Sequence, residues 1–326
     1  MISKTCRAFI EKGLIYHPVY GSGFSNHLPM SLVALDQLGA SEAQLENYYS
    51  TSSSRLDLRK TDSENGTFNF TEKALGQKDL FEDFFRYFKD RLKHTSAEKL
   101  LTEVIPVLMK GVGGAAFHPL IRLSYALRSD CRDEIAMSLA YWATEYLELG
   151  NSHQHHDESL GDIRTRLDAF TSDESFRSTI TDRIKAINEA VQKAEVIIQP
   201  EVLTLKDIRE FSLGEFAKAD NFTLLHTVTA SHAFRSASHY FENEEEALRY
   251  LWEAIVMAQL STGIKYNGVP AKTPEIKMDW PEIIEHALNS TDDHVIKLVY
   301  TCFDENNETP DPLYHFIAQR AVSKGK

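Results

Sequence analysis

The sequence predicts an all-α protein: a single large multi-helix domain with a buried site between helices. Apolar residues recur at helical spacing along most of the chain, as at Leu28, Leu32, Leu35 and Leu38. No set of alternating strands and no repeat of fixed period interrupts this pattern. With 326 residues, of which 42% are hydrophobic and 25% charged, the chain can bury a sizeable core.

Capping residues and prolines indicate where the helices begin and end. Gly39 closes the first apolar helix, and Ser41 with Gln44 forms a capping box for the next. Trp280-Pro281 begins a late helix, and Ser290 or Thr291 is expected to cap the one after it. Other helical patterns cover 77–94, 96–110, 132–149, 172–197, 204–217, 221–242, 244–262 and 310–322.

Two polar stretches predict surface segments. Residues 51–70 form a long excursion with a hairpin at Asn65-Gly66. The segment "GNSHQHHDESLGD" is the best candidate for a division of the chain. We therefore predict one domain over residues 1–326, divisible into halves 1–150 and 157–326 that pack around one site.

Charge and composition exclude several classes of function. The formal net charge of −13 argues against nucleic-acid and membrane partners, since both favour basic surfaces. No stretch approaches the roughly 20 apolar residues that span a bilayer. The start "MISKTCRAFIEKG" has no long apolar run or cleavage site of a secretory signal. Cys6, Cys131 and Cys302 lie far apart and are read as reduced thiols, so we expect a cytoplasmic protein.

Histidines at helix starts are the main candidates for chemistry. His27 and His118 precede Leu28-Pro29 and Pro119, and His294 follows a Ser/Thr/Asp cap. The positive end of a helix dipole disfavours imidazolium, and neutral imidazole is the form that binds metal. His226 differs, because it lies well inside an apolar helix. Each histidine taken singly is more often a capping or core residue, and together they make a metal site in a helical bundle an interpretation of equal weight.

Lys297 lies three residues after His294, so the two side chains share a helical face among apolar neighbours. One interpretation is a lysine that covers apolar surface while its ammonium stays in water. The alternative is a buried amine with a lowered pKa, which can take up carbon dioxide and become a carbamate ligand. His153, His155 and His156 are interpreted as a solvated loop with at most adventitious metal affinity.

Several known motifs are absent from the sequence. The Glu-x-x-His pairs of di-iron bundles, H-E-x-x-H, G-x-S-x-G and the P-loop are not found. "GVGGAA" at 111–116 lacks the order of a dinucleotide fingerprint, and we interpret it as a tight turn before His118. No segment predicts a nicotinamide site, so participation of NADPH is left open.

Four long stretches resemble the questin oxidase-like family. They are "NHLPMSLVALDQLGAS", "GVGGAAFHPLIRLSYAL", "LLHTVTASHAF" and "DDHVIKLVY", in the family's order, and the resemblance covers about residues 16–322. It implies enzymes that oxidatively open anthraquinone rings, first described as Baeyer–Villiger-type oxidases. For some members it implies a non-haem iron held by histidines and a carboxylated lysine. Those ligands map onto His27, His118, His226, His294 and Lys297.

Two departures qualify the resemblance. The fungal relatives have additional histidines where this chain has Met30 and Arg122, so anthraquinone is not carried over as the substrate. His232 follows His226 by six residues, about 240° around a helix, so both cannot easily face one ion. We choose His226 as the ligand and leave His232 as a residue that either contacts a ligand from behind or lies at the surface.

The resulting expectation is a metal-dependent oxidoreductase that acts with O2 on an aromatic or polyketide-like small molecule. We expect Fe(II), with zinc or manganese as alternatives, and His226 and Lys297 as the catalytic residues. Phe24, Phe117, Tyr125 and Phe222 are candidate pocket residues, each with core packing as its alternative role. Two other interpretations are a metal-dependent hydrolase with the same centre and a non-catalytic helical protein.

Overall fold

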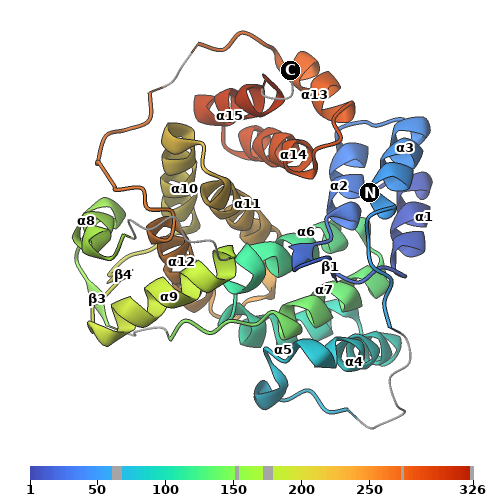
Figure 1. Ribbon diagram of the computed structural model, residues 1–326, viewed down its shortest axis with the longest axis horizontal. Helices are drawn as coiled ribbons and strands as arrows, with labels where there is room; N and C mark the ends of the chain where they lie inside the picture. Colours follow the sequence, from blue (N-terminus) through green and yellow to red (C-terminus); the bar gives the residue numbers. More distant parts are fainter. Residues whose placement is uncertain (61–67, 151–153, 172–178, 273–274, 324–326) are drawn as a thin grey trace. The chain divides into compact units, whose positions relative to one another are not determined.

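The computed structural model describes residues 1–60, 68–150, 154–171, 179–272 and 275–323, and its regular structure there is overwhelmingly helical. The predicted all-α class is confirmed (Figure 1). The α-helices are α1 (Lys4–Gly13), α2 (Leu28–Gln37), α3 (Glu42–Ser53), α4 (Phe81–His94), α5 (Ala97–Met109), α6 (His118–Ser129), α7 (Arg132–Thr144), α8 (Leu160–Arg166), α9 (Ile180–Lys193), α10 (Leu205–Ala219), α11 (Phe222–Ala237), α12 (Glu244–Leu260), α13 (Trp280–Leu288), α14 (Asp293–Glu308) and α15 (Pro312–Ser323).

Strands are confined to two short pairs in the described residues. β1 (Val19–Tyr20) and β2 (Phe24–Ser25) form an antiparallel pair, with Val19 opposite Ser25. β3 (His155–His156) and β4 (Gln199–Pro200) pair in parallel, with His155 opposite Gln199. These contacts tie down connecting segments and form no layer of their own. The hairpin predicted at Asn65-Gly66 lies outside the described residues.

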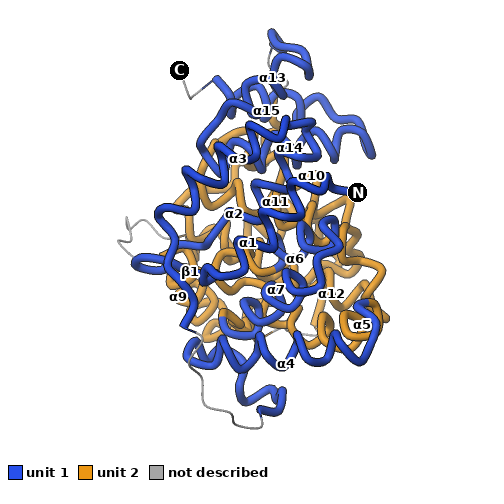
Figure 2. Tube along the Cα trace, turned by 90° about the vertical axis from the view of Figure 1, so that its right-hand side faces the viewer, with its two compact units in different colours: residues 1–97, 120–144, 273–326 blue, residues 98–119, 145–272 orange. Residues whose placement is uncertain are grey.

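The chain divides into two compact units, coloured separately in Figure 2. Unit 1 comprises residues 1–97, 120–144 and 273–326, and unit 2 comprises residues 98–119 and 145–272. His27, His294 and Lys297 belong to unit 1, whereas His118 and His226 belong to unit 2. A single domain over 1–326 with halves 1–150 and 157–326 remains a prediction.

Unit 1 is held together by helices from all three of its segments. α1 packs against α2 and α3, and α4 packs against α7, whose residues from Glu134 to Thr144 are all buried. α14 contacts both α2 and α15, and α13 completes the group of three C-terminal helices (Figure 1). α14, which carries His294 and Lys297, packs against α2. This contact places the start of α2, which directly follows His27, beside α14.

Unit 2 is built around α12, which is buried over its whole second half. α12 packs against α9 and α11, and α10 lies alongside α11 (Figure 1). The indole Nε1–H of Trp252 donates to the carbonyl oxygen of Ile198 at 2.7 Å. This bond satisfies the one polar group of a large buried side chain and joins α12 to the segment before β4.

Most predicted helix ends are confirmed. The capping box of Ser41 and Gln44 is formed, and Gly39 adopts a positive φ of 93° just after α2. Trp280-Pro281 begins α13. The predicted cap of α14 at Ser290 or Thr291 is wrong: Asp292 is the cap, because its carboxylate accepts the backbone N–H of His294 at 2.8 Å.

Other boundaries differ from the prediction for local reasons. The helix predicted over 132–149 ends at Thr144, because Leu147 leaves the helix and donates its N–H to the carbonyl of Gly111 at 3.4 Å. The sequence does not predict α1 and α8. Each is short and begins after a serine, Ser3 or Ser159, whose hydroxyl accepts a first-turn N–H.

The three cysteines are buried and free of disulfides, and burial raises the pKa of the Cys302 thiol far above its ordinary value. Among the described helices, none combines the length and the apolar character needed to cross a membrane.

Candidate metal centre

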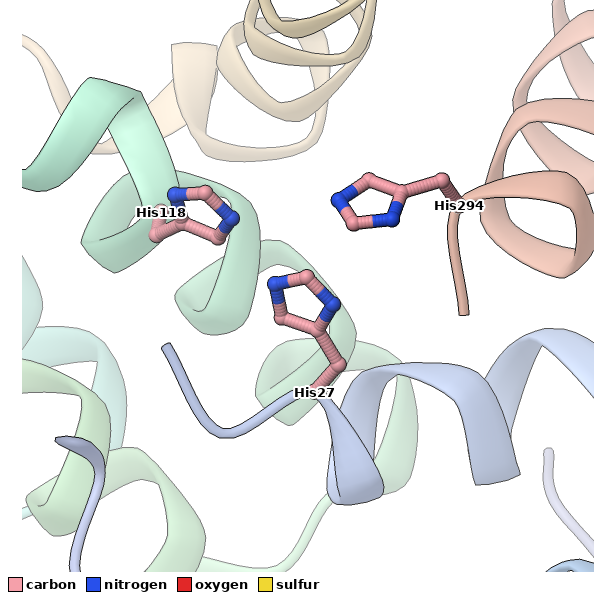
Figure 3. Close-up of side chains that lie close together, drawn as sticks. All are labelled: His27, His118 and His294. Atoms are coloured by element: carbon pink, nitrogen blue, oxygen red, sulfur yellow. The ribbon is translucent and has the colours of Figure 1, made fainter. Parts of the chain in front are cut away.

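Two histidines of unit 1 face one another at the starts of two packed helices. His27 occupies the cap position of α2, and His294 is the second residue of α14. Figure 3 shows their rings turned toward one another, with ring centroids 4.8 Å apart and planes at 81°. One ligand nitrogen of each lies within 4.8 Å of the other. The sequence prediction that both lie at helix starts is confirmed.

Consecutive aspartates face the Nδ1 atoms of this pair. Asp293 Oδ2 lies 3.5 Å from Nδ1 of His27, and Asp292 Oδ1 lies 3.5 Å from Nδ1 of His294. A neutral imidazole carries a proton on one nitrogen and a lone pair on the other. A negative oxygen near Nδ1 favours the proton there, which leaves the lone pair on Nε2 for a ligand.

Burial favours the neutral form of His294. Burial is the largest cause that lowers its pKa below the ordinary 6.5, and the positive charge of Lys297 lowers it further. The hydrogen bond to Asp292 acts in the opposite direction and raises it. Loss of solvent is thus a cause that the sequence prediction, based on the helix dipole alone, did not include.

Lys297 is buried, as the second of the two sequence interpretations requires. Its side chain is only 3% exposed, so its ammonium does not reach bulk water as a snorkelling lysine would. Burial lowers its pKa from 10.5 to about 8, against the opposing pull of Asp293 and Asp292. Within the described chain, no carboxylate forms an ion pair with it. Near neutral pH the charged form therefore still predominates, but the neutral amine is far more accessible than it is for an ordinary lysine.

Unit 2 contains a second pair of histidines. His118 begins α6, and His226 lies one turn into α11; their ring centroids are 4.7 Å apart. Nδ1–H of His118 donates to the carbonyl of Ala115 at 2.6 Å, and Nδ1–H of His226 donates to the carbonyl of Phe222 at 2.8 Å. Because a carbonyl oxygen can only accept, both rings are protonated on Nδ1 when neutral, and the lone pair is on Nε2.

A strained turn places His118. Ala115, Ala116 and Phe117 have φ values of 44°, 51° and 66°, which L-residues rarely adopt. The turn packs against α9 and α11, and its Ala115 carbonyl is the acceptor for His118. Three successive left-handed residues directly before a candidate ligand indicate that the fold tolerates strain in order to aim this ring.

The glycines of "GVGGAA" allow close approach, which refines the predicted turn. A Cβ on Gly114 would lie 1.7 Å from the carbonyl oxygen of Glu145, and a Cβ on Gly111 would lie 2.2 Å from the Tyr146 ring. The positive φ angles fall on the alanines and Phe117, whereas the glycines are needed for lack of a side chain.

The remaining histidine predictions have mixed outcomes. His232 is buried, with 2% of its surface exposed, so a surface role is wrong and only an interior role is left. His155 and His156 are exposed, in agreement with the solvated-loop interpretation, although they form the short strand β3. His153 lies outside the described residues.

The two positions that depart from the fungal pattern are both interior. Met30 is fully buried in α2. Arg122 is 1% exposed and donates from Nε and Nη2 to the two carboxylate oxygens of Glu134, at 2.7 and 3.0 Å. A buried, bidentate ion pair thus occupies a position at which the resemblance implies a histidine.

The candidate pocket aromatics divide into two classes. Phe117 and Tyr125 are buried, and Tyr125 packs 5.8 Å from Tyr300 between ring centroids, which favours their core role. Phe24 and Phe222 are exposed by 62% and 55%. Phe222 also meets the His226 ring edge-on at 4.8 Å, so an aromatic surface adjoins one of the candidate ligands.

Sequence reasoning missed three residues around His27. Asp293 contacts His27, and its carboxylate also accepts from the hydroxyl of Tyr48 and from Nη2 of Arg55, the latter at 2.7 Å. Asp293 could have been found as the neighbour of His294 in "DDHVIK". Tyr48 and Arg55 had no such signal, because α3 reaches the site only through the packing of α2 and α3.

The fold and these two pairs define a helical protein whose buried imidazoles could hold a metal ion. The chain matches the model of the questin oxidase-like family over residues 24–302, which is most of its length. It belongs to the questin oxidase-like family, as the resemblance predicted, and membership implies an oxidoreductase-like enzyme. No curated protein matches the chain.

Proposed function

We propose that this protein is a metal-dependent oxidoreductase that acts with O2 on an aromatic or polyketide-like small molecule. In this proposal the unit 1 ligands His27, His294 and Lys297 and the unit 2 ligands His118 and His226 hold one ion together. The family match supports it, and so do two histidine pairs that each lie within one unit, His27 with His294 and His118 with His226. Cytoplasmic localisation and the absence of nucleic-acid partners are part of the same proposal.

One observation carries the proposal: each of the four imidazoles has an oxygen atom within 3.5 Å of Nδ1. The Ala115 and Phe222 carbonyls accept hydrogen bonds from His118 and His226, and carboxylate oxygens of Asp293 and Asp292 lie 3.5 Å from Nδ1 of His27 and His294. Histidines that bind metal ordinarily hold their second nitrogen in this way.

Lys297 would add an oxygen ligand. Its neutral amine can attack carbon dioxide, forming an N–C bond and releasing one proton to solvent, to give a carbamate. The product is an anion, so it would offset the positive charge of the ion. Burial and the lowered pKa of Lys297 support this step, since only the neutral amine carries the lone pair that attacks.

Neutral nitrogen and anionic oxygen donors suit Fe(II), and zinc or manganese would also accept them. Iron, when bound, supplies the redox chemistry that an oxygen-dependent reaction needs. The chain's own residues orient the donors: Asp292, Asp293 and the two carbonyls fix the rings. The exposed ring of Phe222, beside His226, offers a surface on which a planar aromatic substrate could stack.

Metal analysis tests the proposal most directly. Protein purified without chelator is expected to carry about one equivalent of metal per chain, with iron giving oxygen-dependent turnover. His118→Ala and His294→Ala are each expected to weaken binding by about 100-fold or more, since changes to outer partners alone cost about 10–100-fold. His94→Ala is the matched control, because His94 is exposed at the end of α4.

Three outcomes would contradict the proposal in different ways. Metal-free wild type that also fails to take up added Fe(II) would leave a non-catalytic helical protein. Equal affinities in His118→Ala and His94→Ala would remove His118 from the centre. Turnover with zinc and without O2 would favour the hydrolase alternative, because zinc has no redox chemistry.

A further inference from the structure

Asp293 lies at the centre of a set of contacts within unit 1. One carboxylate oxygen, Oδ1, accepts from the Tyr48 hydroxyl. The other, Oδ2, accepts from Nη2 of Arg55 at 2.7 Å and lies 3.5 Å from Nδ1 of His27. The side chains of Asp293 and His27 are only 13% and 8% exposed, so the charge of the carboxylate acts strongly on the ring, whereas Arg55 reaches the carboxylate from the solvent side with 47% of its side chain exposed.

These contacts come from three helices and have no role in capping. Asp293 is the first residue of α14, and His27 directly precedes α2. Tyr48 lies within α3, and Arg55 follows two residues after the end of that helix. The capping of α14 is done by Asp292, whose side chain is 60% exposed. Asp293 is therefore not needed to begin the helix, and its burial against two donors calls for another explanation.

We propose that Asp293, held by Tyr48 and Arg55, is a positioning residue that fixes the tautomer and the orientation of His27. The negative Oδ2 disfavours a lone pair on Nδ1, so the proton stays there and Nε2 keeps the lone pair. Two donors keep the carboxylate from rotating away, because Tyr48 holds one oxygen while Arg55 holds the other. The consequence for metal binding rests on the proposed function, whereas the effect on the ring does not.

Asp293 is expected to affect its neighbouring histidine ring more strongly than Asp292 does. Asp292 also lies 3.5 Å from a ring nitrogen, that of His294, but it is mostly exposed and already accepts a backbone N–H. A solvated carboxylate exerts a weaker field on a neighbouring ring than a buried one does. We therefore expect the ring of His27 to depend on its aspartate more strongly than the ring of His294 does.

The test measures the ring directly, in metal-free protein. Nitrogen-15 spectra of histidine-labelled protein at about pH 8 distinguish the two neutral tautomers, and a His27→Gln variant assigns the His27 signals. Wild type is expected to show His27 protonated on Nδ1 alone. Asp293→Asn is expected to show a mixture of both tautomers, and Tyr48→Phe a smaller shift in the same direction.

Tyr49→Phe is the matched control, because Tyr49 is the adjacent buried tyrosine on α3 and packs on Phe9 away from these contacts. Its His27 signals should equal those of wild type. Wild-type His27 protonated on Nε2, or an unchanged ring in Asp293→Asn, would overturn the inference. If Asp293→Asn does not fold, Tyr48→Phe and Arg55→Gln decide it by the same spectra.

Metal titration of the same variants separates this inference from the proposed function. Asp293→Asn is expected to bind Fe(II) about 10–100-fold more weakly than wild type, with Tyr49→Phe unchanged. Wild type that shows the expected tautomer but binds no metal would contradict the proposed function and leave the positioning of His27 intact. Wild type that binds metal while Asp293→Asn binds equally well would contradict the positioning role alone.

Discussion

Replacing Lys297 by methionine should make the protein more stable and less able to bind metal. The pKa of Lys297 falls from 10.5 to about 8 on folding, which corresponds to about 3 kcal/mol of unfavourable free energy while the amine is charged. Methionine fills similar space without a charge, so its free energy of unfolding at pH 7 should exceed that of wild type by up to about 3 kcal/mol. Denaturant titration in carbon dioxide-free buffer measures this difference.

The pH dependence of the free energy of unfolding checks independently that the charged Lys297 destabilises the folded state. Below about pH 8 Lys297 is protonated in both states, so the folded state carries the full penalty. Between about pH 8 and 10.5 the folded state has already lost the proton, and wild type should gain stability relative to the variant. The gap between the two should therefore close as pH rises through this window, and a constant gap would contradict a buried, charged lysine.

Added bicarbonate links this stability to the proposed carbamate. It should stabilise wild type, because the carbamate removes the buried positive charge, and it should have no effect on Lys297→Met. A carbon-13 signal from labelled bicarbonate should appear in wild type only. Lys193→Met, at an exposed position near the end of α9, is the control for a general effect of removing a lysine.

Replacing Gly114 by alanine should be among the most destabilising single changes in unit 2. The new Cβ would lie 1.7 Å from the carbonyl oxygen of Glu145 and 2.8 Å from its carbonyl carbon, so backbone must move. Overpacking typically costs about 1–3 kcal/mol and occasionally more, and a contact this close to backbone belongs at the upper end of that range. Because the turn from Gly114 to Phe117 aims His118, metal affinity should fall along with the free energy of unfolding.

Gly214→Ala provides the contrast for this prediction. Gly214 lies within α10, and a Cβ there meets nothing within 4 Å. Alanine should therefore stabilise that helix by about 0.5–1 kcal/mol. Denaturant titrations should show a lower free energy of unfolding than wild type for Gly114→Ala and a higher one for Gly214→Ala. Two variants of equal stability would show that the backbone at Glu145 moves aside at no cost in free energy.

Much of the fold could be predicted because helices depend on local periodicity and capping. The capping box at Ser41, the stop at Gly39 and the start at Trp280 follow from neighbouring residues alone, and the structure has all three. The end of α7 could not be predicted, because it depends on a hydrogen bond to Gly111, a residue distant in the chain. Competition from distant partners is invisible to a local pattern.

In the candidate site, too, features set by neighbouring residues could be predicted and features set by distant contacts could not. The placement of His118 and His294 at helix starts followed from a proline and a cap beside them in the sequence. The contacts of Asp293 with Tyr48 and Arg55 span about 240 positions and arise only through the packing of helices. The strain at Ala115 also had no signal, since alanine gives no indication of a left-handed backbone.

The order in which the chain supplies its parts has a consequence for biosynthesis. Unit 1 needs residues 273–326, and α14 from that last stretch packs on α2 from the first. Residues 273–326 must therefore be synthesised before unit 1 can be completed, and until then the helices of residues 1–97 have apolar faces uncovered. We expect chaperones to shield the nascent chain, and a nonsense codon near position 272 to yield an insoluble product rather than a smaller working one.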